Sequence, residues 1–287
     1  MDIAGRYGIK VIEDVSHAQG GLYKGRKLGT IGDVGAMSLM SGKSFAIGEG
    51  GMLTTDDTEI YERAIAFGHY ERFDKRIMTE ELKPYLRLPM GGYKCRMHQL
   101  SSAVGRVQLK VYDKQCEEIR KAMDYFWDLL EGVPGIRAHR TSKDSGSNMG
   151  GWYAAHGIYC PEELEGLSIA RFTEAIRAEG VDNCYPGCNS ALHTHALFNT
   201  CDVYGHGKPT RIANAERDVR ELDKDLQLSE GIGARIYFIP WFKKFMPDII
   251  KQYAGAFSKV AANYRELLPG DGGNPENLGM WHFFRHR

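Results

Sequence analysis

Two residues near the start of the chain are of types that could do chemistry together. Lys43 lies in the stretch SLMSGKSFAIGEGG, residues 38–51, and Asp14 lies in the short apolar run KVIEDV, residues 10–15. A lysine amine can form a Schiff base with an aldehyde, and an aspartate can keep a pyridinium nitrogen protonated, which are the two groups that a pyridoxal phosphate enzyme needs. Spacing alone leaves a simpler interpretation open, because strand-end aspartates often form turns and most lysines are solvated.

The sequence Gly42-Lys43-Ser44 also suggests a nucleotide phosphate loop, which is a competing interpretation of Lys43. That motif, G-x-x-x-x-G-K-[ST], needs its first glycine five residues before the second. Met37 stands at that position, and the residues that follow it are typical of a strand. Without that glycine, a backbone cradle for phosphate cannot be assumed. The sequence therefore disfavours a phosphate loop.

The two residues can meet only if neighbouring strands end side by side. Apolar runs predict strands at residues 10–15, 34–39, 50–57 and 154–160. Helical periodicity predicts helices at residues 59–68, 97–131, 168–180 and from about 247. This alternation predicts an α/β fold, in which the carboxyl ends of parallel strands would bring Asp14 and Lys43 to one crevice.

The segments between the predicted strands and helices are expected to be turns and loops. Residues 23–33 are typical of a turn-rich connection, and residues 184–210 of a long loop. The first three strands are expected to be parallel. Because a sheet of three strands is narrow, we expect something to cover its edge.

The composition limits the partners that the protein can have. Lys plus Arg and Asp plus Glu each number 37, so the formal net charge is zero, which argues against nucleic acid or an anionic membrane as the main partner. No apolar run is long enough to span a bilayer, and the start has no signal-peptide pattern. We therefore expect a soluble, cytoplasmic protein.

The six cysteines do not predict a disulfide framework in a chain of 287 residues. Cys184 and Cys188 are followed closely by His193 and His195, which are residue types that bind zinc, but the common CxxC spacing is absent. We expect scattered reduced thiols and no metal.

A resemblance to a known family supports the first interpretation of Lys43. It is clearest over residues 11–57, VIEDVSHAQGGLYKGRKLGTIGDVGAMSLMSGKSFAIGEGGMLTTDD. This stretch resembles the core of the DegT/StrS sugar aminotransferase family, with the blocks E-D-x-[AS]-[HQ]-A-x-G, G-x-x-G-D, S-[FL]-x-x-x-K and G-E-G-G in order. The segment GGYKCRMHQLSSAVGRVQL, residues 91–109, is similar to the family's G-[YF]-[NK]-x-R-[ML] segment.

The resemblance implies the fold of pyridoxal 5'-phosphate (PLP) dependent transferases of fold type I, with a mixed sheet in the large domain. It implies that Lys43 forms the Schiff base and that Asp14 pairs with the pyridinium nitrogen. His17 would lie beside the cofactor ring, and Ser38 would bind its phosphate. Lys94, where the family often has Asn, would reach the phosphate in a neighbouring subunit, so a homodimer is expected.

The implied activity is the transfer of an amino group from glutamate or glutamine to a keto-sugar nucleotide or keto-cyclitol. Residues 1–120 would be the C-terminal part of the PLP-binding domain, and residues 121–287 the small domain. The family has about 130–160 further residues before this point, a domain's worth. We therefore expect a second chain to supply that half, unless the start is misassigned or the protein is a remnant. The alternative is a non-catalytic or regulatory half-subunit. Sugar dehydratases of the family usually have His in place of Lys43.

Overall fold

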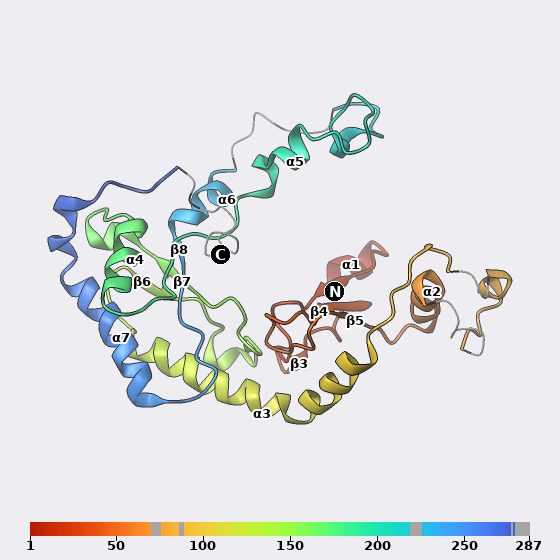
Figure 1. Ribbon diagram of the computed structural model, residues 1–287, viewed down its shortest axis with the longest axis horizontal. Coiled ribbons are helices and arrows are strands. Elements are labelled where there is room, and N and C mark those ends of the chain that lie inside the picture. The colour runs from red at the N-terminus through yellow and green to blue at the C-terminus, as the bar shows by residue number, and fades with distance from the viewer. Residues whose placement is uncertain (70–75, 86–88, 219–225, 277, 279–287) are drawn as a thin grey trace. The chain divides into compact units, whose positions relative to one another are not determined.

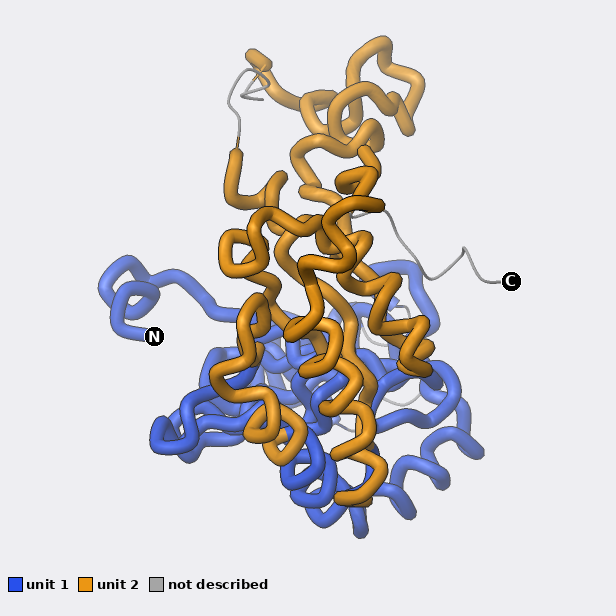
Figure 2. Tube along the Cα trace, turned by 90° about the vertical axis from the view of Figure 1, so that its left-hand side faces the viewer, with its two compact units in different colours: residues 1–123, 140–154, 243–245 blue, residues 124–139, 155–242, 246–287 orange. Residues whose placement is uncertain are grey.

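The computed structural model describes residues 1–69, 76–85, 89–218, 226–276 and 278. The chain forms two compact units (Figure 2). Unit 1 comprises residues 1–123, 140–154 and 243–245, and unit 2 comprises residues 124–139, 155–242 and 246–287. Two short segments from later in the chain therefore belong to unit 1 together with the N-terminal residues.

Unit 1 is built on a mixed sheet with the strand order β1-β4-β5 (Figure 1). β1 (Ile12–Asp14) runs parallel to β4 (Val34–Ser38), whereas β5 (Gly51–Thr54) runs antiparallel to β4. The expectation that all three strands are parallel is therefore wrong. The physical reason lies in residues 39–50, which fold back on themselves through the hydrogen bonds Leu39 N–H to Gly50 O and Ile47 N–H to Leu39 O, both 2.9 Å. A parallel strand would instead need residues 39–50 to cross to the opposite end of the sheet.

A small hairpin stands where the sequence predicted only a turn-rich connection. β2 (Leu22–Tyr23) pairs antiparallel with β3 (Arg26–Lys27). The two residues between them, Lys24 and Gly25, have φ angles of 49° and 79°. Two consecutive residues with positive φ form the tight turns typical of hairpins, and this conformation favours glycine at one of the two positions.

The helices of unit 1 confirm the periodicity in the sequence. α1 (Asp2–Arg6) comes first, and α2 (Thr58–Gly68) begins after Asp57, whose side chain accepts the N–H groups of Glu59 and Ile60. This is the usual N-cap arrangement. α3 (Gln99–Leu129) runs from unit 1 into unit 2. In unit 1 the helix packs on the sheet through an apolar cluster formed by Met37, Leu39, Phe45, Ile47, Tyr112 and Cys116.

The Glu13 carboxylate fastens the turn that leads into β4. It accepts hydrogen bonds from the backbone N–H groups of Gly29 at 2.9 Å and of Ile31 and Gly32 at 2.7 Å. Burial alone would raise the pKa of Glu13, but these hydrogen bonds together with the Arg26 charge outweigh it and hold the pKa below its usual value.

Replacing Glu13 with glutamine should lower the free energy of unfolding by about 2 kcal/mol at pH 7, because an uncharged amide cannot accept three hydrogen bonds as strongly. The folded state favours the carboxylate, so its stabilising effect is present above the unfolded-state pKa of about 4.3. The effect is lost as the pH falls through the lower pKa of the folded state. Urea unfolding at pH 7 and in acid measures both conditions. The wild-type protein and Glu13→Gln should converge in acid, and a difference that stays constant would contradict this role.

Unit 2 contains an antiparallel sheet with the order β6-β7-β8, formed by β6 (Ile136–Ala138), β7 (His156–Tyr159) and β8 (Ile236–Phe238). The sequence predicted only β7. The predicted helices are present as α4 (Ile169–Ala178) and α7 (Pro247–Ala262), which pack against each other. Two short helices, α5 (Ala196–Asn199) and α6 (Gln227–Gly231), lie between α4 and α7 in the sequence. The fully buried aromatic core of this unit consists of Phe126, Trp127, Tyr159, Phe172, Tyr237 and Phe257.

The predicted long loop at residues 184–210 is confirmed in outline, because it holds α5, a short 3₁₀ turn at Leu192–Thr194 and the first residue of another at Thr210–Ile212. Within the described ranges, no helix has the length and apolar character that crossing a membrane requires.

Candidate active site

The ends of two parallel strands position the predicted residues. Asp14 is the last residue of β1 and lies beside Ala36 of β4 in the register. β4 ends at Ser38, and Lys43 follows in the turn that its own N–H closes with the carbonyl of Met40 at 2.9 Å. Because parallel strands end at one edge of the sheet, Asp14 and the loop of Lys43 share that edge. This is the placement that the sequence predicted.

Asp14 is held in its ionised form. Its Oδ1 accepts the Ser16 N–H at 3.0 Å. Hydrogen bonds from the Ser16 side chain and backbone lower the pKa of Asp14 and outweigh the opposing effect of burial, and the charges of His17 and Lys43 lower it further. A carboxylate at this edge therefore stays negative at neutral pH.

The amine of Lys43 is half-buried, and its surroundings favour loss of its proton. Burial lowers the pKa of Lys43, while the charge of Asp14 opposes that shift. For His17, burial and then the charge of Lys43 lower the pKa, against the opposing effect of Asp14. The imidazole of His17 is therefore mainly neutral at pH 7. These three residues thus influence one another across the same edge of the sheet.

Ser38 is tied to the same edge through its backbone. Its N–H donates to the Ser16 Oγ at 3.0 Å, and its carbonyl accepts a hydrogen bond from the Gln19 amide. The Ser38 hydroxyl accepts the Met40 N–H at 3.4 Å, a contact that does not use the hydroxyl proton. The hydroxyl can therefore still donate to an anionic group.

Lys94 comes from a different part of unit 1. It is exposed and lies in the irregular segment that precedes α3. Its carbonyl accepts the N–H of Arg96 at 3.0 Å. The predicted contact of Lys94 with a neighbouring subunit stays a prediction.

A hydrogen-bonded network supports the loop of Lys43, and the sequence did not reveal it. Gln19 is 4% exposed, and its Oε1 accepts the Ser44 hydroxyl at 2.9 Å. The hydroxyls of Ser44 and Tyr112 lie 2.7 Å apart, and the Tyr112 hydroxyl donates to the Gln19 carbonyl at 3.0 Å. Ser44 directly follows Lys43, so α3 and the β1 loop together fix the backbone that carries the lysine. Two features of the sequence could have indicated this network: Gln19 within the block EDVSHAQG, and the serine that follows Lys43.

Tyr153 is the second residue that sequence reasoning missed. Its ring centroid lies 4.5 Å from the Lys43 Nζ and 4.7 Å from the centroid of the His17 ring. The residue comes from the segment 140–154 that joins unit 1. No pattern in the sequence connects a tyrosine so far along the chain with Lys43.

Gly151 packs closely against Ser44, which allows a test of the hydrogen-bonded network around Gln19, Ser44 and Tyr112. An added Cβ at Gly151 would stand 2.3 Å from the Ser44 side chain and 2.6 Å from the Tyr112 hydroxyl. Gly151→Ala should therefore lower the free energy of unfolding by about 3 kcal/mol, as overpacking does at the upper end of its usual range. Urea unfolding measures the loss. Gly5→Ala is the matched control, because its Cβ would meet nothing within 4 Å. Equal stabilities for the two variants would contradict the close approach.

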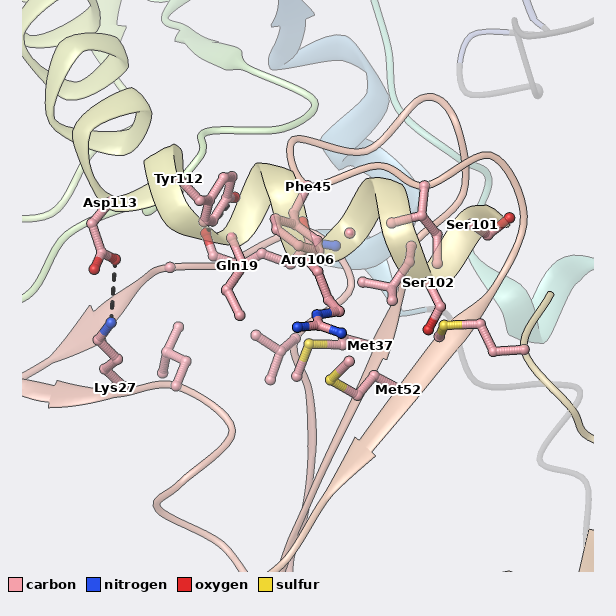
Figure 3. Close-up of a pocket in the computed structure, with 18 residues that line it drawn as sticks. Gln19, Lys27, Met37, Phe45, Met52, Ser101, Ser102, Arg106, Tyr112 and Asp113 are labelled. Atoms are coloured by element: carbon pink, nitrogen blue, oxygen red, sulfur yellow. Dashed lines mark hydrogen bonds and ion pairs between the residues drawn. The ribbon is translucent and has the colours of Figure 1, made fainter. Parts of the chain in front are cut away.

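A largely apolar cavity in unit 1 is separate from the predicted site residues Asp14, His17 and Lys43. It has a volume of about 280 Å³ and lies between the sheet and α3 (Figure 3). Gln19 and Tyr112 line it, whereas Asp14, His17 and Lys43 do not. Figure 3 shows Arg106 extending from α3 toward Met37 and Met52 of the sheet. The cavity thus adjoins the network that supports Lys43, but it does not include the sheet edge where Asp14 and Lys43 lie.

The structure also tests the phosphate-loop interpretation of Lys43 and the zinc-site interpretation of the cysteines. Met37 and Ser38 pair with Met52 and Gly51 within the sheet, so the residues that a phosphate loop would need form a strand. In unit 2, burial raises the pKa of the Cys184 thiol, which opposes the thiolate that zinc requires. Among residues whose placement the structure describes, no group of three or more His, Cys, Asp or Glu side chains is arranged to hold a metal.

The fold is that of the PLP-dependent transferases of fold type I. The fold is shared with the X-ray structure of an aminotransferase from Psychrobacter cryohalolentis, with a TM-score of 0.70 at 23% sequence identity, over 92% of this chain and 65% of that one. The chain belongs to the DegT/DnrJ/EryC1/StrS aminotransferase family, whose model matches residues 1–219.

Two relatives extend along most of this chain. An uncharacterized protein of Methanocaldococcus jannaschii is 37% identical over 272 residues, which cover 92% of this chain and 63% of the relative. The L-glutamine:scyllo-inosose aminotransferase of Streptomyces griseus is 28% identical over 281 residues, which cover 93% of this chain and 62% of the relative. The chain thus spans about three fifths of the length of these relatives.

The residues at the sheet edge fit PLP. An ionised Asp14 suits a protonated ring nitrogen, and an amine whose pKa is lowered, as in Lys43, suits an aldehyde. The Ser38 hydroxyl can donate to a phosphate oxygen, and a neutral His17 can lie beside an aromatic ring without adding charge. The ring nitrogen, the aldehyde and the phosphate of the cofactor therefore each have a chemically matched residue in unit 1.

Proposed function

We propose that the protein is a PLP-dependent aminotransferase, which moves an amino group from glutamate or glutamine to the ketone of a sugar nucleotide or a cyclitol. The observation that carries this proposal is that the half-buried Lys43, with its pKa lowered by burial, shares one edge of the sheet with an Asp14 that stays ionised. Family membership agrees with this activity.

When bound, the cofactor supplies an aldehyde that can carry an amino group and a protonated ring that withdraws electrons from the substrate carbon. Asp14 would keep the proton on the ring nitrogen. Its hydrogen bonds with Ser16 hold the carboxylate ionised, so it does not take that proton itself. Asp14 would thereby preserve the charge on which the chemistry depends.

Lys43 would hold the cofactor through the aldehyde carbon and, when released, move a proton to and from the substrate carbon. A lysine can act as a base only when its amine is neutral, and burial raises the neutral fraction of Lys43. Ser38 would donate its hydroxyl to the phosphate, and His17 would pack beside the ring. A family dehydratase would have His at position 43, so the lysine favours amino transfer.

The donor and acceptor follow from the family resemblance and from the Streptomyces relative, whose name gives L-glutamine and scyllo-inosose. The test is incubation of the whole protein and PLP with ¹⁵N-labelled glutamate or glutamine and a series of keto-sugar nucleotides and keto-cyclitols. Mass spectrometry then detects ¹⁵N in the product. Added PLP should also gain the visible absorbance of a lysine-bound aldehyde, and Lys43→Ala should lack it. Absence of both signals would refute the proposal.

The assembly of the whole protein is part of the proposal. Lys94 would reach the cofactor phosphate of a neighbouring subunit, which requires at least two subunits. Light scattering with mass spectrometry of the purified complex distinguishes a homodimer from a heteromer in which another chain supplies part of the fold. If such a heteromer kept full activity with Lys43→Ala, this chain would instead be a non-catalytic or regulatory subunit.

A further inference from the structure

The ring of Tyr153 lies beside two predicted site residues. The Lys43 Nζ lies 4.5 Å from the centroid of the Tyr153 ring, and the His17 ring meets Tyr153 edge-on at 4.7 Å with an interplanar angle of 71°. A cation within about 6 Å of an aromatic face is attracted by the ring quadrupole. Tyr153 therefore contacts the reactive amine directly through its aromatic face.

The backbone on both sides of Tyr153 is strained. Trp152 and Ala154 have φ angles of 52° and 54°, a region that residues with side chains rarely adopt. Trp152 is only 3% exposed, and its backbone N–H donates to the Met149 carbonyl at 3.0 Å. Strain of this kind persists only where the surroundings hold it, and it concentrates at functional sites.

The segment before Tyr153 is fixed to the loop that carries His17. The Gly151 N–H donates to the Gln19 carbonyl at 3.0 Å, and the Asn148 N–H donates to the Leu22 carbonyl at 3.0 Å. Asn148 Oδ1 in turn accepts the N–H of Leu22 at 3.2 Å. These bonds join residues far apart in sequence within unit 1 and deliver the Tyr153 ring to a defined place.

We propose that Tyr153 is a positioning residue, whose ring holds the charged amine of Lys43 in place until the amine reacts. This inference rests on the proposed function, because it takes Lys43 as the reacting group. The ring prefers the ammonium form, so it counteracts the effect of burial on Lys43. Tyr153 would thus set how readily the amine loses its proton, with its aromatic face and not its hydroxyl.

Two titratable groups of unit 1 bear on this amine. Asp14, from the end of β1, raises the pKa of Lys43, while the neutral His17 contacts the Tyr153 ring. Removing the ring takes away an interaction that favours the ammonium, so the pKa of Lys43 should fall. At a pH below that pKa, the neutral fraction of the amine should rise.

The test measures the Lys43 amine directly in the whole protein, freed of cofactor. Trace labelling with acetic anhydride over a range of pH, followed by mass spectrometry of the Lys43 peptide, reports the neutral fraction. Tyr153→Leu should raise labelling of Lys43 at pH 7 by about two- to five-fold, the range that a surface cation–π interaction implies. Tyr153→Phe should match the wild-type protein. Tyr23→Leu is the matched control, because Tyr23 pairs with the exposed Lys24 and should leave Lys43 unchanged.

A second series keeps the experiment decisive if the leucine variant does not fold. Fluorinated phenylalanines incorporated at position 153 keep the ring shape but withdraw electron density from its face. Labelling of Lys43 should rise with each added fluorine, a dependence that a purely structural role would not produce. Equal labelling across the series would overturn the proposal. The measurement uses no substrate or cofactor, so its failure is distinguishable from the failure of the aminotransferase proposal.

Discussion

Replacing Lys43 with alanine should lower kcat for amino transfer by about 10³- to 10⁴-fold, near the upper range of what a positioned acid–base group contributes. The variant loses the amine that would hold the cofactor and move protons at the substrate carbon. Lys43 is only half-buried, so its truncation should leave the fold intact. Steady-state rates with the ¹⁵N-labelled donor measure the effect, and circular dichroism checks the fold.

Lys43→Arg separates charge from reactivity in the same assay. Arginine retains the positive charge beside Asp14, but it has no neutral amine at accessible pH. It should therefore be as inactive as the alanine variant. Lys110→Ala, an exposed lysine on α3, is the matched control and should keep wild-type rates. An arginine variant with substantial activity would show that Lys43 acts only as a charge.

The sequence could predict that Asp14 and Lys43 lie at one edge of the sheet, because that placement depends only on the two short apolar runs that precede them. KVIEDV and VGAMSL are apolar runs that pair as parallel strands, and the polar residues that follow parallel strands share an edge. The length and spacing of the helices were equally readable, because the periodicity of α3 and the N-cap of α2 are local signals.

The direction of β5 and the role of Tyr153 depend on features that are not local. β5 is antiparallel because the 39–50 loop folds back through hydrogen bonds such as that between Leu39 and Gly50, which no propensity predicts. Tyr153 reaches Lys43 because a late segment is fastened to Gln19 and Leu22 through backbone groups. Backbone pairing is nearly independent of residue type. The short strands β6 and β8 also lack a signal, since three residues are too few for periodicity.

Asp14→Asn should lower kcat by about 10²- to 10³-fold, comparable with the loss of one preorganised electrostatic group at a reacting centre. Asparagine has nearly the shape of aspartate and can accept the Ser16 N–H, but it cannot balance the charge of a protonated ring nitrogen. The variant should still hold PLP through Lys43, because that contact does not involve residue 14. The amount of bound PLP and kcat should be measured in the same preparation. We expect the variant to keep its PLP while its kcat falls.

The same substitution makes a second, independent prediction about Lys43. The charge of Asp14 raises the pKa of Lys43 against the effect of burial, so Asp14→Asn should lower that pKa further. The neutral fraction of the amine at pH 7 should rise even though catalysis falls, and trace labelling of Lys43 measures it. Asp113→Asn is the matched control, since this exposed carboxylate pairs with Lys27 on another part of unit 1. If Asp14→Asn lost activity through misfolding alone, labelling of many lysines would rise together; a rise confined to Lys43 would show that Asp14 acts by its charge on this amine.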